Sequence, residues 1–237
     1  MQPFCYTILD APAAGDWNMA VDEAMLNESV ANDFLAVRCY SWAQPTVSLG
    51  HFQAKERLVI DSRFEELARV RRLSGGGAIL HHHEVTYSCC VPISHPLTRS
   101  PGTIYDLAHD VIIGALREFG VESAMRGEKL DQESRFLCFS RGDPRDIVIG
   151  AHKIVGSAQR RRRGAVLQHG SILTGRSEYA PEFPGIHDLT GVCIDRQGLA
   201  EMVAERIAQE LGTPSPLIQL PSNVQHQADQ LVENYRE

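Results

Sequence analysis

Several strand-like runs of this chain are separated by turns of only a few residues, and this spacing restricts the folds that it can form. Strands joined by such short turns pair antiparallel, because a parallel pair needs a crossover of about a dozen residues. Apolar spacing also predicts amphipathic helices over residues 18–30, 103–119 and 199–211. The pattern therefore favours an α+β fold, with a mixed, largely antiparallel sheet packed with helices, over a doubly wound fold. The strand-like runs are residues 35–40, 46–49, 153–159 and 165–173.

Other segments carry predictions of local structure. Residues 61–68 are expected to form a short helix. Residues 78–80 and 85–93 are expected to form the two arms of a hairpin. Residues 213–237 contain three prolines and several glutamines, so we expect a loosely ordered C-terminal tail that follows one domain over residues 1–212.

The composition excludes several classes of protein. With 237 residues, 43% of them hydrophobic, the chain suits one globular domain of ordinary core size. No apolar run approaches the ~20 residues of a membrane span, and the N-terminus lacks the pattern of a signal peptide, so we expect a cytoplasmic protein. The six cysteines lack CxxC spacing, which favours reduced thiols over disulfides or a zinc site. A net charge of −7 argues against nucleic-acid binding, with Arg160-Arg161-Arg162-Arg163 as a local exception.

Two segments rich in small residues predict a ligand site. The first is Ser74-Gly75-Gly76-Gly77, in which three successive residues lack a Cβ atom. A backbone without Cβ atoms can approach a ligand closely and offer N–H donors to its oxygens. The second is Lys153-Ile154-Val155-Gly156-Ser157-Ala158-Gln159. We interpret its lysine as a positive charge aimed at the oxygens that the glycine segment holds.

Two runs of identical residues each have a structural and a functional interpretation. His81-His82-His83 could indicate a metal, but successive residues of a strand point to opposite faces, so we predict no metal site there. The arginine run at 160–163 is expected to be a solvated turn. Its functional alternative is a docking patch for an acidic partner protein.

Five motifs occur in order along most of the chain, from about Ile8 to Leu211. They are Asn18-Met19-Ala20-Val21-Asp22-Glu23-Ala24, Arg71-Arg72-x-Ser74-Gly75-Gly76-Gly77, His81 with Thr86-Tyr87-Ser88, Lys153-x-x-Gly156-Ser157-Ala158-Gln159, and Gln168-His169-Gly170-x-x-Leu173. Together they resemble the lipoate-protein ligase A and octanoyltransferase family, which is related in fold to biotin protein ligases. The glycine triplet alone would be a weak signal, whereas five motifs in register are specific. The resemblance implies a biotin/lipoate ligase-type catalytic domain over residues 1–212.

The resemblance also implies which residues bind substrate. Lys153 matches the lysine that sits at the acyl carbonyl in the family, where it would stabilise a developing oxyanion. Cys138, fifteen residues before Lys153, matches the acyl-carrying cysteine of the cysteine-dependent octanoyltransferases, the branch that the chain resembles most. A pocket for an eight-carbon acyl chain and its activated carboxyl would involve Arg72, Ser74, Gly75, Gly76, Gly77, His81, Gly156, Ser157, Ala158 and His169.

On this resemblance we expect an acyltransferase that moves an octanoyl group from octanoyl-acyl carrier protein to the lysine of a lipoyl domain. Cys138 would be the nucleophile and Lys153 would polarise the carbonyl. Both steps exchange groups of similar energy, so no cofactor is required. The acceptor would be a glycine cleavage H protein or a dehydrogenase E2 subunit, and neither nucleic acid nor membrane is expected as a partner.

Two alternatives remain open from the sequence. An ATP-dependent lipoate-protein ligase would activate free lipoate or octanoate with MgATP and hold the acyl-adenylate beside Lys153. The full glycine triplet, which ends at Gly77, is the ligase-like form of the motif. The third class is a noncatalytic lipoate- or biotin-binding module, and the presence of Lys153 and His169 argues against it.

Overall fold

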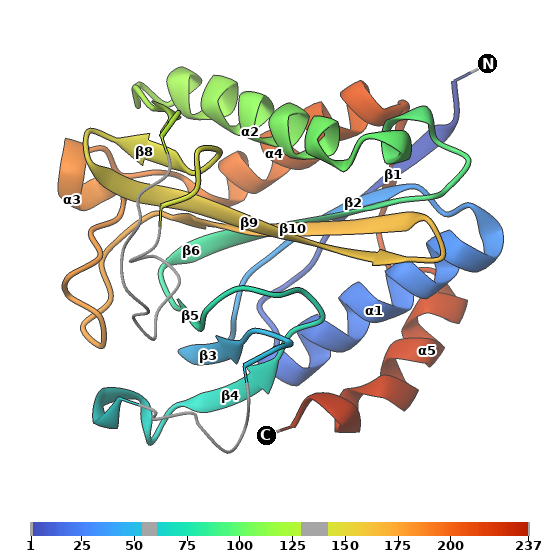
Figure 1. Ribbon diagram of the computed structural model, residues 1–237, viewed down its shortest axis with the longest axis horizontal. Helices are drawn as coiled ribbons and strands as arrows, with labels where there is room; N and C mark the ends of the chain where they lie inside the picture. The colour runs from blue at the N-terminus through green and yellow to red at the C-terminus, as the bar shows by residue number, and fades with distance from the viewer. Residues whose placement is uncertain (1, 54–60, 129–141, 237) are drawn as a thin grey trace.

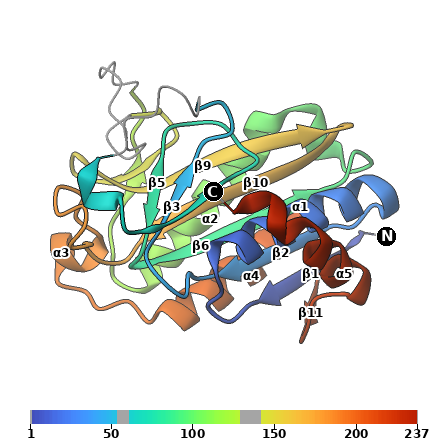
Figure 2. The same ribbon diagram turned by 90° about the horizontal axis from the view of Figure 1, so that it is seen from below.

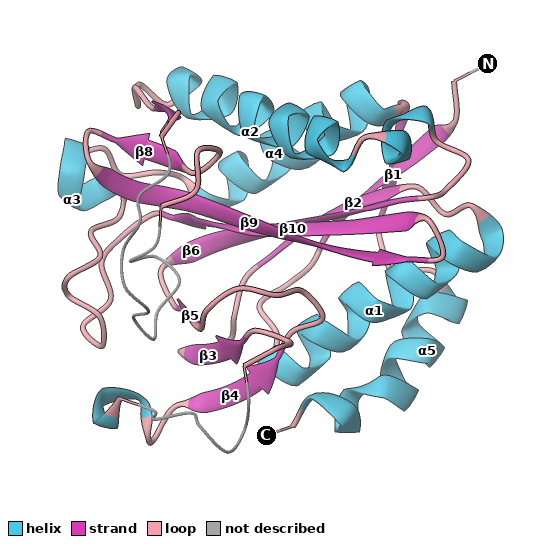
Figure 3. Cartoon of the chain, viewed as in Figure 1, coloured by secondary structure: helices cyan, strands magenta, loops and turns pink. Residues whose placement is uncertain are grey.

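An eight-stranded sheet forms the centre of the molecule, and helices cover both of its faces (Figure 1, Figure 3). The computed structural model describes residues 2–53, 61–128 and 142–236. The order in the large sheet is β11 (Thr213–Leu217), β1 (Phe4–Leu9), β2 (Ala36–Tyr40), β6 (Glu84–Val91), β10 (Ala165–Leu173), β9 (His152–Arg162), β8 (Ile147–Ile149) and β7 (Ala124–Met125). A second, three-stranded sheet has the order β4 (Ala68–Arg71), β3 (Thr46–Leu49) and β5 (Ile79–His81).

The pairing in both sheets confirms the predicted mixed, largely antiparallel α+β fold. Only β1 with β11, β1 with β2, and β3 with β4 run parallel among the described strand pairs. The remaining described pairs are antiparallel, and β9 and β10 form the long hairpin that the sequence predicts around the arginine run. The shorter helical elements are α3 (Ile186–Thr190), α5 (Ser222–Leu231), and the 3₁₀ turns η2 (Ser62–Phe64), η3 (Pro96–Arg99) and η5 (Val232–Tyr235).

Three long helices bury the two faces of the large sheet. Helices α2 (Pro101–Glu118) and α4 (Arg196–Leu211) cover one face, and α1 (Gly15–Asn32) covers the other. Side chains of a strand alternate between faces, and in β2 Val37 and Cys39 pack into the core with α2 and α4, while Ala36 and Tyr40 pack into the core with α1. Because both faces are covered, every residue of β2 is buried.

No helix among the described residues is long and apolar enough to cross a membrane.

The C-terminal segment differs from the loosely ordered tail that we expected. Strand β11 pairs in parallel with β1 at the edge of the large sheet, and helix α5 lies along α1 (Figure 2). An edge strand tolerates Pro214 and Pro216, because a missing N–H costs nothing where no further strand pairs. Val224 and Ala228, one turn apart on α5, are fully buried against α1. The segment therefore forms part of the core of the same unit.

Two local predictions are wrong. Strands β5 and β6 do not form a hairpin, because β5 pairs with β3 in the small sheet and β6 pairs with β2 and β10 in the large one. Such a short apolar run fits either sheet, so packing decides its partner. Residues 61–68 form only the turn η2 before β4 begins at Ala68. Phe64 is the single buried residue of that turn, which leaves no apolar face to hold a longer helix.

A buried ionic cluster fastens α1 to the large sheet. Arg38, on β2, has no exposed surface, and its Nε donates to Asp10 Oδ2 at 2.6 Å. Its Nη1 donates to Asp22 Oδ1 at 3.1 Å, and its Nη2 donates to Asn18 Oδ1 at 2.9 Å, both on α1. The guanidinium also lies 3.9 Å from the ring centroid of Tyr40. A buried charge of this kind is tolerable only while its partners remain in place.

Replacing Arg38 with methionine is therefore expected to lower the free energy of unfolding by about 3–5 kcal/mol, because Asp22 and Asp10 lose their common cation. Urea denaturation followed by circular dichroism measures the change. Arg117→Met is the matched control, since the Arg117 side chain is 64% exposed and its ion pair with Glu122 spans 4.0 Å. Equal stabilities of the two variants would contradict a structural role for the cluster.

Candidate functional site

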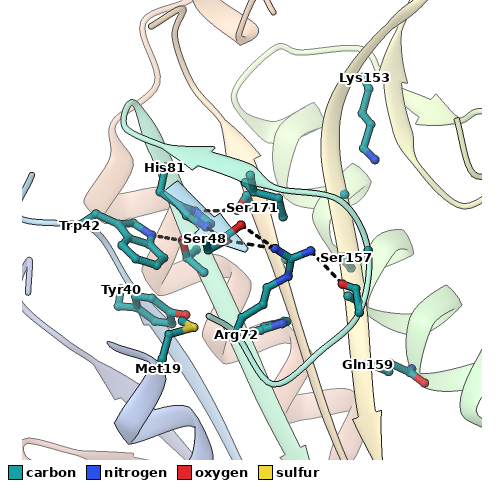
Figure 4. A pocket seen from close by; sticks show the side chains of 18 residues that line it. Met19, Tyr40, Trp42, Ser48, Arg72, His81, Lys153, Ser157, Gln159 and Ser171 are labelled. Carbon is teal, nitrogen blue, oxygen red and sulfur yellow. Dashed lines mark hydrogen bonds between the residues drawn. The ribbon is translucent and has the colours of Figure 1, made fainter. Parts of the chain in front are cut away.

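A cavity of about 260 Å³ lies between the small sheet and strands β9 and β10 of the large sheet (Figure 4). The structure brings most of the predicted substrate-binding residues together in its wall. Ser74 and Gly77 are not in that wall, and Cys138 lies outside the described residues. The predicted residues that do line the cavity are Arg72, Gly75, Gly76, His81, Lys153, Gly156, Ser157, Ala158 and His169.

The apolar part of the wall comes from residues that were not among the predicted site residues, and only Met19 of them lies within a motif. Met19, Tyr40, Trp42 and Ile79 line the cavity, and Figure 4 shows the first three gathered on the side opposite Lys153. Each belongs to a segment whose apolar pattern is that of an ordinary core, so the pattern does not distinguish a residue that lines a cavity from one that packs in the core. The cavity thus has an apolar side and a side with a single ammonium group.

Arg72 shapes the glycine loop from behind. Its side chain is buried, and Nη1 donates to the Ser48 carbonyl at 2.8 Å. Nη2 donates to the carbonyls of Gly75 at 2.8 Å and Gly77 at 2.7 Å. Gly76 has φ of 98°, a conformation that favours glycine, and a Cβ on Gly50 would overlap the Gly76 carbonyl oxygen. Arg72 therefore holds the loop in shape through the carbonyls of Gly75 and Gly77.

Lys153 stands at the start of β9 in an ion pair with Asp146. The Nζ atom lies 2.9 Å from Asp146 Oδ1, and the two side chains are only 6% and 3% exposed. Burial raises the pKa of Asp146, and the nearby Lys153 charge offsets only part of that effect. Gly156 makes room for the lysine, because a Cβ there would lie 2.5 Å from Lys153 Cε and 2.7 Å from Nζ. Asp146 and Gly156 together fix where the positive charge lies.

His169 connects the glycine loop to the buried ionic cluster. Its Nδ1 lies 3.2 Å from Asp22 Oδ2, and its Nε2 lies 2.5 Å from Ser74 Oγ. A carboxylate only accepts, so Nδ1 carries the proton of this bond. Burial alone would raise the pKa of Asp22, but the hydrogen bond from His169 and the charge of Arg38 outweigh it and lower the pKa. Ser74 thus acts from outside the cavity wall, through His169.

His81 is fixed by contacts on three sides. Its ring stacks on Trp42 with centroids 3.9 Å apart and an interplanar angle of 12°. Nε2 lies 2.7 Å from Ser48 Oγ, and Nδ1 lies 2.8 Å from Glu84 Oε1. Glu84 is fully buried and also accepts from Thr86 at 2.6 Å. The imidazole therefore cannot turn freely inside the cavity.

A directed chain of hydrogen bonds runs from the sheet to α2. The Arg145 carbonyl accepts from His109 Nδ1 at 2.5 Å, so the Nε2 of the neutral imidazole must accept from Ser157 Oγ at 2.7 Å. Ser157 in turn accepts from the Tyr87 hydroxyl at 2.7 Å, and Tyr87 accepts from Gln168 Nε2 at 2.9 Å. Burial lowers the pKa of His109 to about 4, with the Lys153 charge adding to the effect, which keeps the ring neutral.

None of the described cysteines lies in the cavity wall. Burial raises the pKa of Cys39 and of Cys89 to about 12, so these thiols are unsuited to form thiolates. Cys5 and Cys90 are buried as well, and Cys193 is exposed away from the cavity.

Two residues of the arginine run are engaged within the molecule. Arg161 donates to the Thr98 carbonyl at 2.5 Å, and Arg162 lies 2.7 Å from Glu23 Oε1. Arg163 occupies the turn between β9 and β10 with φ of 49°. The solvated turn that we expected over the whole run is therefore wrong for Arg160, Arg161 and Arg162, which belong to β9 and pair with β10. A docking role for the run stays a prediction.

Comparison with known sequences gives a family and close relatives. Residues 15–178 match the model of the lipoyl protein ligase A/B catalytic domain. The octanoyltransferase LipM of Kyrpidia tusciae is 31% identical over 255 residues, which cover 92% of this chain and 91% of the relative. Other relatives, also named octanoyltransferase LipM, align over 60–62% of their own length, so the chain spans about three fifths of them.

Solved structures with the same architecture share little sequence. Protein Ta0514 from T. acidophilum, solved with bound lipoic acid, superposes with a TM-score of 0.76 at 19% identity and covers 98% of this chain and 96% of its own. A bipartite lipoate protein ligase from Thermoplasma acidophilum, studied with its E2 lipoyl domain, gives a TM-score of 0.72 at 17% identity, with 96% and 91% covered. At such identity the likeness concerns the fold alone.

Gly156→Ala is expected to push the Lys153 ammonium away from Asp146, because the new methyl group overlaps Cε and Nζ. A displaced ammonium is more exposed and should react several-fold faster with an amine-acylating reagent. Peptide mass spectrometry resolves the chain's three lysines, so Lys55 and Lys129 serve as internal references. Gly114→Ala is the matched control, because nothing lies within 4 Å of that position. An unchanged rate at Lys153 in Gly156→Ala would refute this role of the glycine.

His109 is expected to make the protein less stable in acid. Its pKa falls from 6.5 in the unfolded chain to about 4 in the fold, so its contribution is complete above pH 6.5 and is lost as the pH falls through 4. The loss should reach about 3 kcal/mol. Urea denaturation between pH 4 and pH 7 measures it, and His109→Gln should remove this part of the pH dependence. Parallel curves for wild type and variant would contradict the assignment, and the exposed His226→Gln is the control.

Proposed function

Because the chain belongs to the lipoyl protein ligase A/B catalytic domain family, we propose that it is an octanoyltransferase of protein lipoylation. It would take the octanoyl group from octanoyl-acyl carrier protein and transfer it to the lysine of a lipoyl domain. The observation that carries the proposal is the cavity itself, which combines an apolar wall, the glycine loop and the Lys153 ammonium. Its relatives that are named octanoyltransferase LipM support this choice within the family.

The apolar wall suits the tail of the proposed substrate. Each buried methylene contributes roughly 0.8 kcal/mol, so an octanoyl chain could gain about 5 kcal/mol from burial. Met19, Trp42 and Ile79 supply hydrophobic contacts, and the glycine loop lets the chain pass close to the backbone. This arrangement binds a medium-length acyl group without any polar contact along its tail.

Lys153 is proposed to hold the acyl carbonyl. An ammonium near the carbonyl oxygen stabilises the negative charge that develops when a nucleophile attacks, and its effect is greatest in a site that excludes water. Asp146 would fix its position, and Gly156 would leave it the space to point into the cavity. In this proposal Asp146 determines the position of the Lys153 ammonium and takes no part in the chemical step.

The proposed nucleophile is Cys138. Of the six cysteines, the five that the structure describes are buried elsewhere or exposed away from the cavity. The Cys138 thiolate would attack the thioester carbonyl, and the carrier's thiol would leave as its C–S bond breaks and take up a proton. The amine of the acceptor lysine would then attack the new thioester, forming the amide and releasing Cys138. No nucleotide is required in either step.

The proposed acceptor is a lipoyl domain, either of a glycine cleavage H protein or of a dehydrogenase E2 subunit. A structural neighbour from Thermoplasma acidophilum was studied together with its E2 lipoyl domain, which supports this class of partner. Arg163, which is exposed in the turn between β9 and β10, would offer positive charge to an acidic carrier or acceptor.

The decisive experiment is intact mass spectrometry after incubation with octanoyl-acyl carrier protein. Wild-type protein should gain one octanoyl group, because the thioester intermediate forms before an acceptor is present. Cys138→Ala should gain none and should lose transfer to a lipoyl domain. Cys193→Ala removes the exposed thiol of Cys193 and is expected to behave like wild type.

The ATP-dependent ligase predicts the opposite pattern. Free lipoate with MgATP would then modify the acceptor, and Cys138→Ala would remain active. A noncatalytic binding module would bind octanoate or lipoate without modifying the acceptor under either condition. Each of these results would overturn the transferase.

A further inference from the structure

Outside the cavity, the two remaining histidines of the run at 81–83 lie beside a carboxylate. His81 enters the cavity wall, whereas His82 and His83 form the bend between β5 and β6. The alternation of side chains along a strand does not apply to such a bend. Both imidazoles therefore reach the same side of the chain, next to Glu178 in the segment that follows β10.

The donor atoms of these residues are close together. One ring nitrogen of each histidine and a Glu178 oxygen all lie within 4.8 Å of one another. The two imidazole rings stack with centroids 3.7 Å apart and an interplanar angle of 24°. His82 Nδ1 lies 3.5 Å from Glu178 Oε2 and 3.0 Å from Ser177 Oγ. Two nitrogens and one or two oxygens thus converge from two segments nearly a hundred residues apart.

A small cavity adjoins the cluster. It has a volume of about 30 Å³ and is lined by His82, His83 and Ser177, among others. A water needs roughly 10–15 Å³ of such space and polar partners, so the cavity is large enough for one water, with His82, His83 and Ser177 as the polar part of a largely apolar lining. The volume of this cavity is an observation independent of the donor distances. It provides space for a water as a further ligand of an ion.

We propose that His82, His83 and Glu178 bind a divalent transition-metal cation of the Zn²⁺ class. Imidazole nitrogens favour zinc and its neighbours, whereas calcium and magnesium favour oxygen ligands. Metal–ligand distances of about 2.0–2.2 Å require the three donors to close by a small amount. Glu178 can supply most of this movement, because its side chain is 66% exposed. Three protein ligands leave a fourth position for water.

The ion would join two segments that already meet. The backbone N–H groups of Thr174 and Gly175 donate to the His83 carbonyl at 2.9 Å and 3.2 Å. A metal bridge from His82 and His83 to Glu178 would fasten the same contact through side chains. Because His81 precedes the bend and lines the large cavity, the bridge would also stiffen one wall of that cavity. The ion has no part in the proposed acyl transfer.

The test is a Zn²⁺ titration of the full chain, free of any affinity tag, against a chromophoric chelator. Wild type should bind one ion through nitrogen and oxygen donors, so the Co²⁺-substituted protein should lack a thiolate charge-transfer band. His83→Ala and Glu178→Gln should each weaken binding by more than about tenfold, since even outer ligands of metal sites cost that much. Thermal unfolding should shift upward with Zn²⁺ in wild type, and the shift should be smaller in His83→Ala and Glu178→Gln.

Two control variants make the result specific. His226→Ala removes an exposed histidine of α5 and should bind Zn²⁺ like wild type. Cys193→Ser removes another possible ligand, whose Sγ lies 3.5 Å from His187 Nδ1, and should also leave the affinity unchanged. The proposal fails if His82→Ala/His83→Ala binds Zn²⁺ as tightly as wild type, if the Co²⁺ spectrum shows thiolate ligation, or if wild type binds no ion at micromolar concentration.

Discussion

The Asp22 carboxylate is the interaction on which the arrangement of the site depends. It sits on α1 and accepts hydrogen bonds from Arg38 and Tyr40 of β2 and from Ser88 of β6, at 2.9–3.1 Å. His169 of β10 makes a fourth hydrogen bond to this carboxylate, and its other ring nitrogen is hydrogen-bonded to Ser74. One buried charge therefore sets the distance between a helix, three strands and the glycine loop. A loss of any one donor would leave part of a desolvated carboxylate unsatisfied.

The cavity exists because β5 and β6 belong to different sheets. A hairpin of the two strands would have placed both in one sheet. Strand β5 pairs with β3 in the small sheet, so no neighbouring strand fills the space between the small sheet and strands β9 and β10. Glycines then permit close contacts on both sides, at Gly50 beneath the loop and at Gly156 beside Lys153. Missing methyl groups here determine the form of the site as much as the side chains that are present.

Much of the fold and of the candidate site could be predicted from the sequence. The features that could not be predicted were missed for physical reasons. Short turns implied that the large sheet is largely antiparallel, and the motifs identified Gly75, Lys153 and His169 because a close approach and a charge require those residue types. No local pattern indicates that Asp146 pairs with Lys153, or that His109 on α2 meets Ser157 on β9, since such contacts are made by folding. The prolines of residues 213–237 predicted a loosely ordered tail, but prolines are tolerated at a sheet edge, and β11 forms such an edge.

Trp42 gives the protein an internal optical probe. It is one of two tryptophans in the chain; its indole lines the cavity, stacks on His81 and donates to Thr86 Oγ1 at 2.9 Å. Trp17, the other, is half-buried on α1 and does not line the cavity. A guest that enters replaces water around only one of the two indoles, so its arrival changes the emission of Trp42 against a constant background. Occupancy can thus be followed by fluorescence in the unlabelled protein.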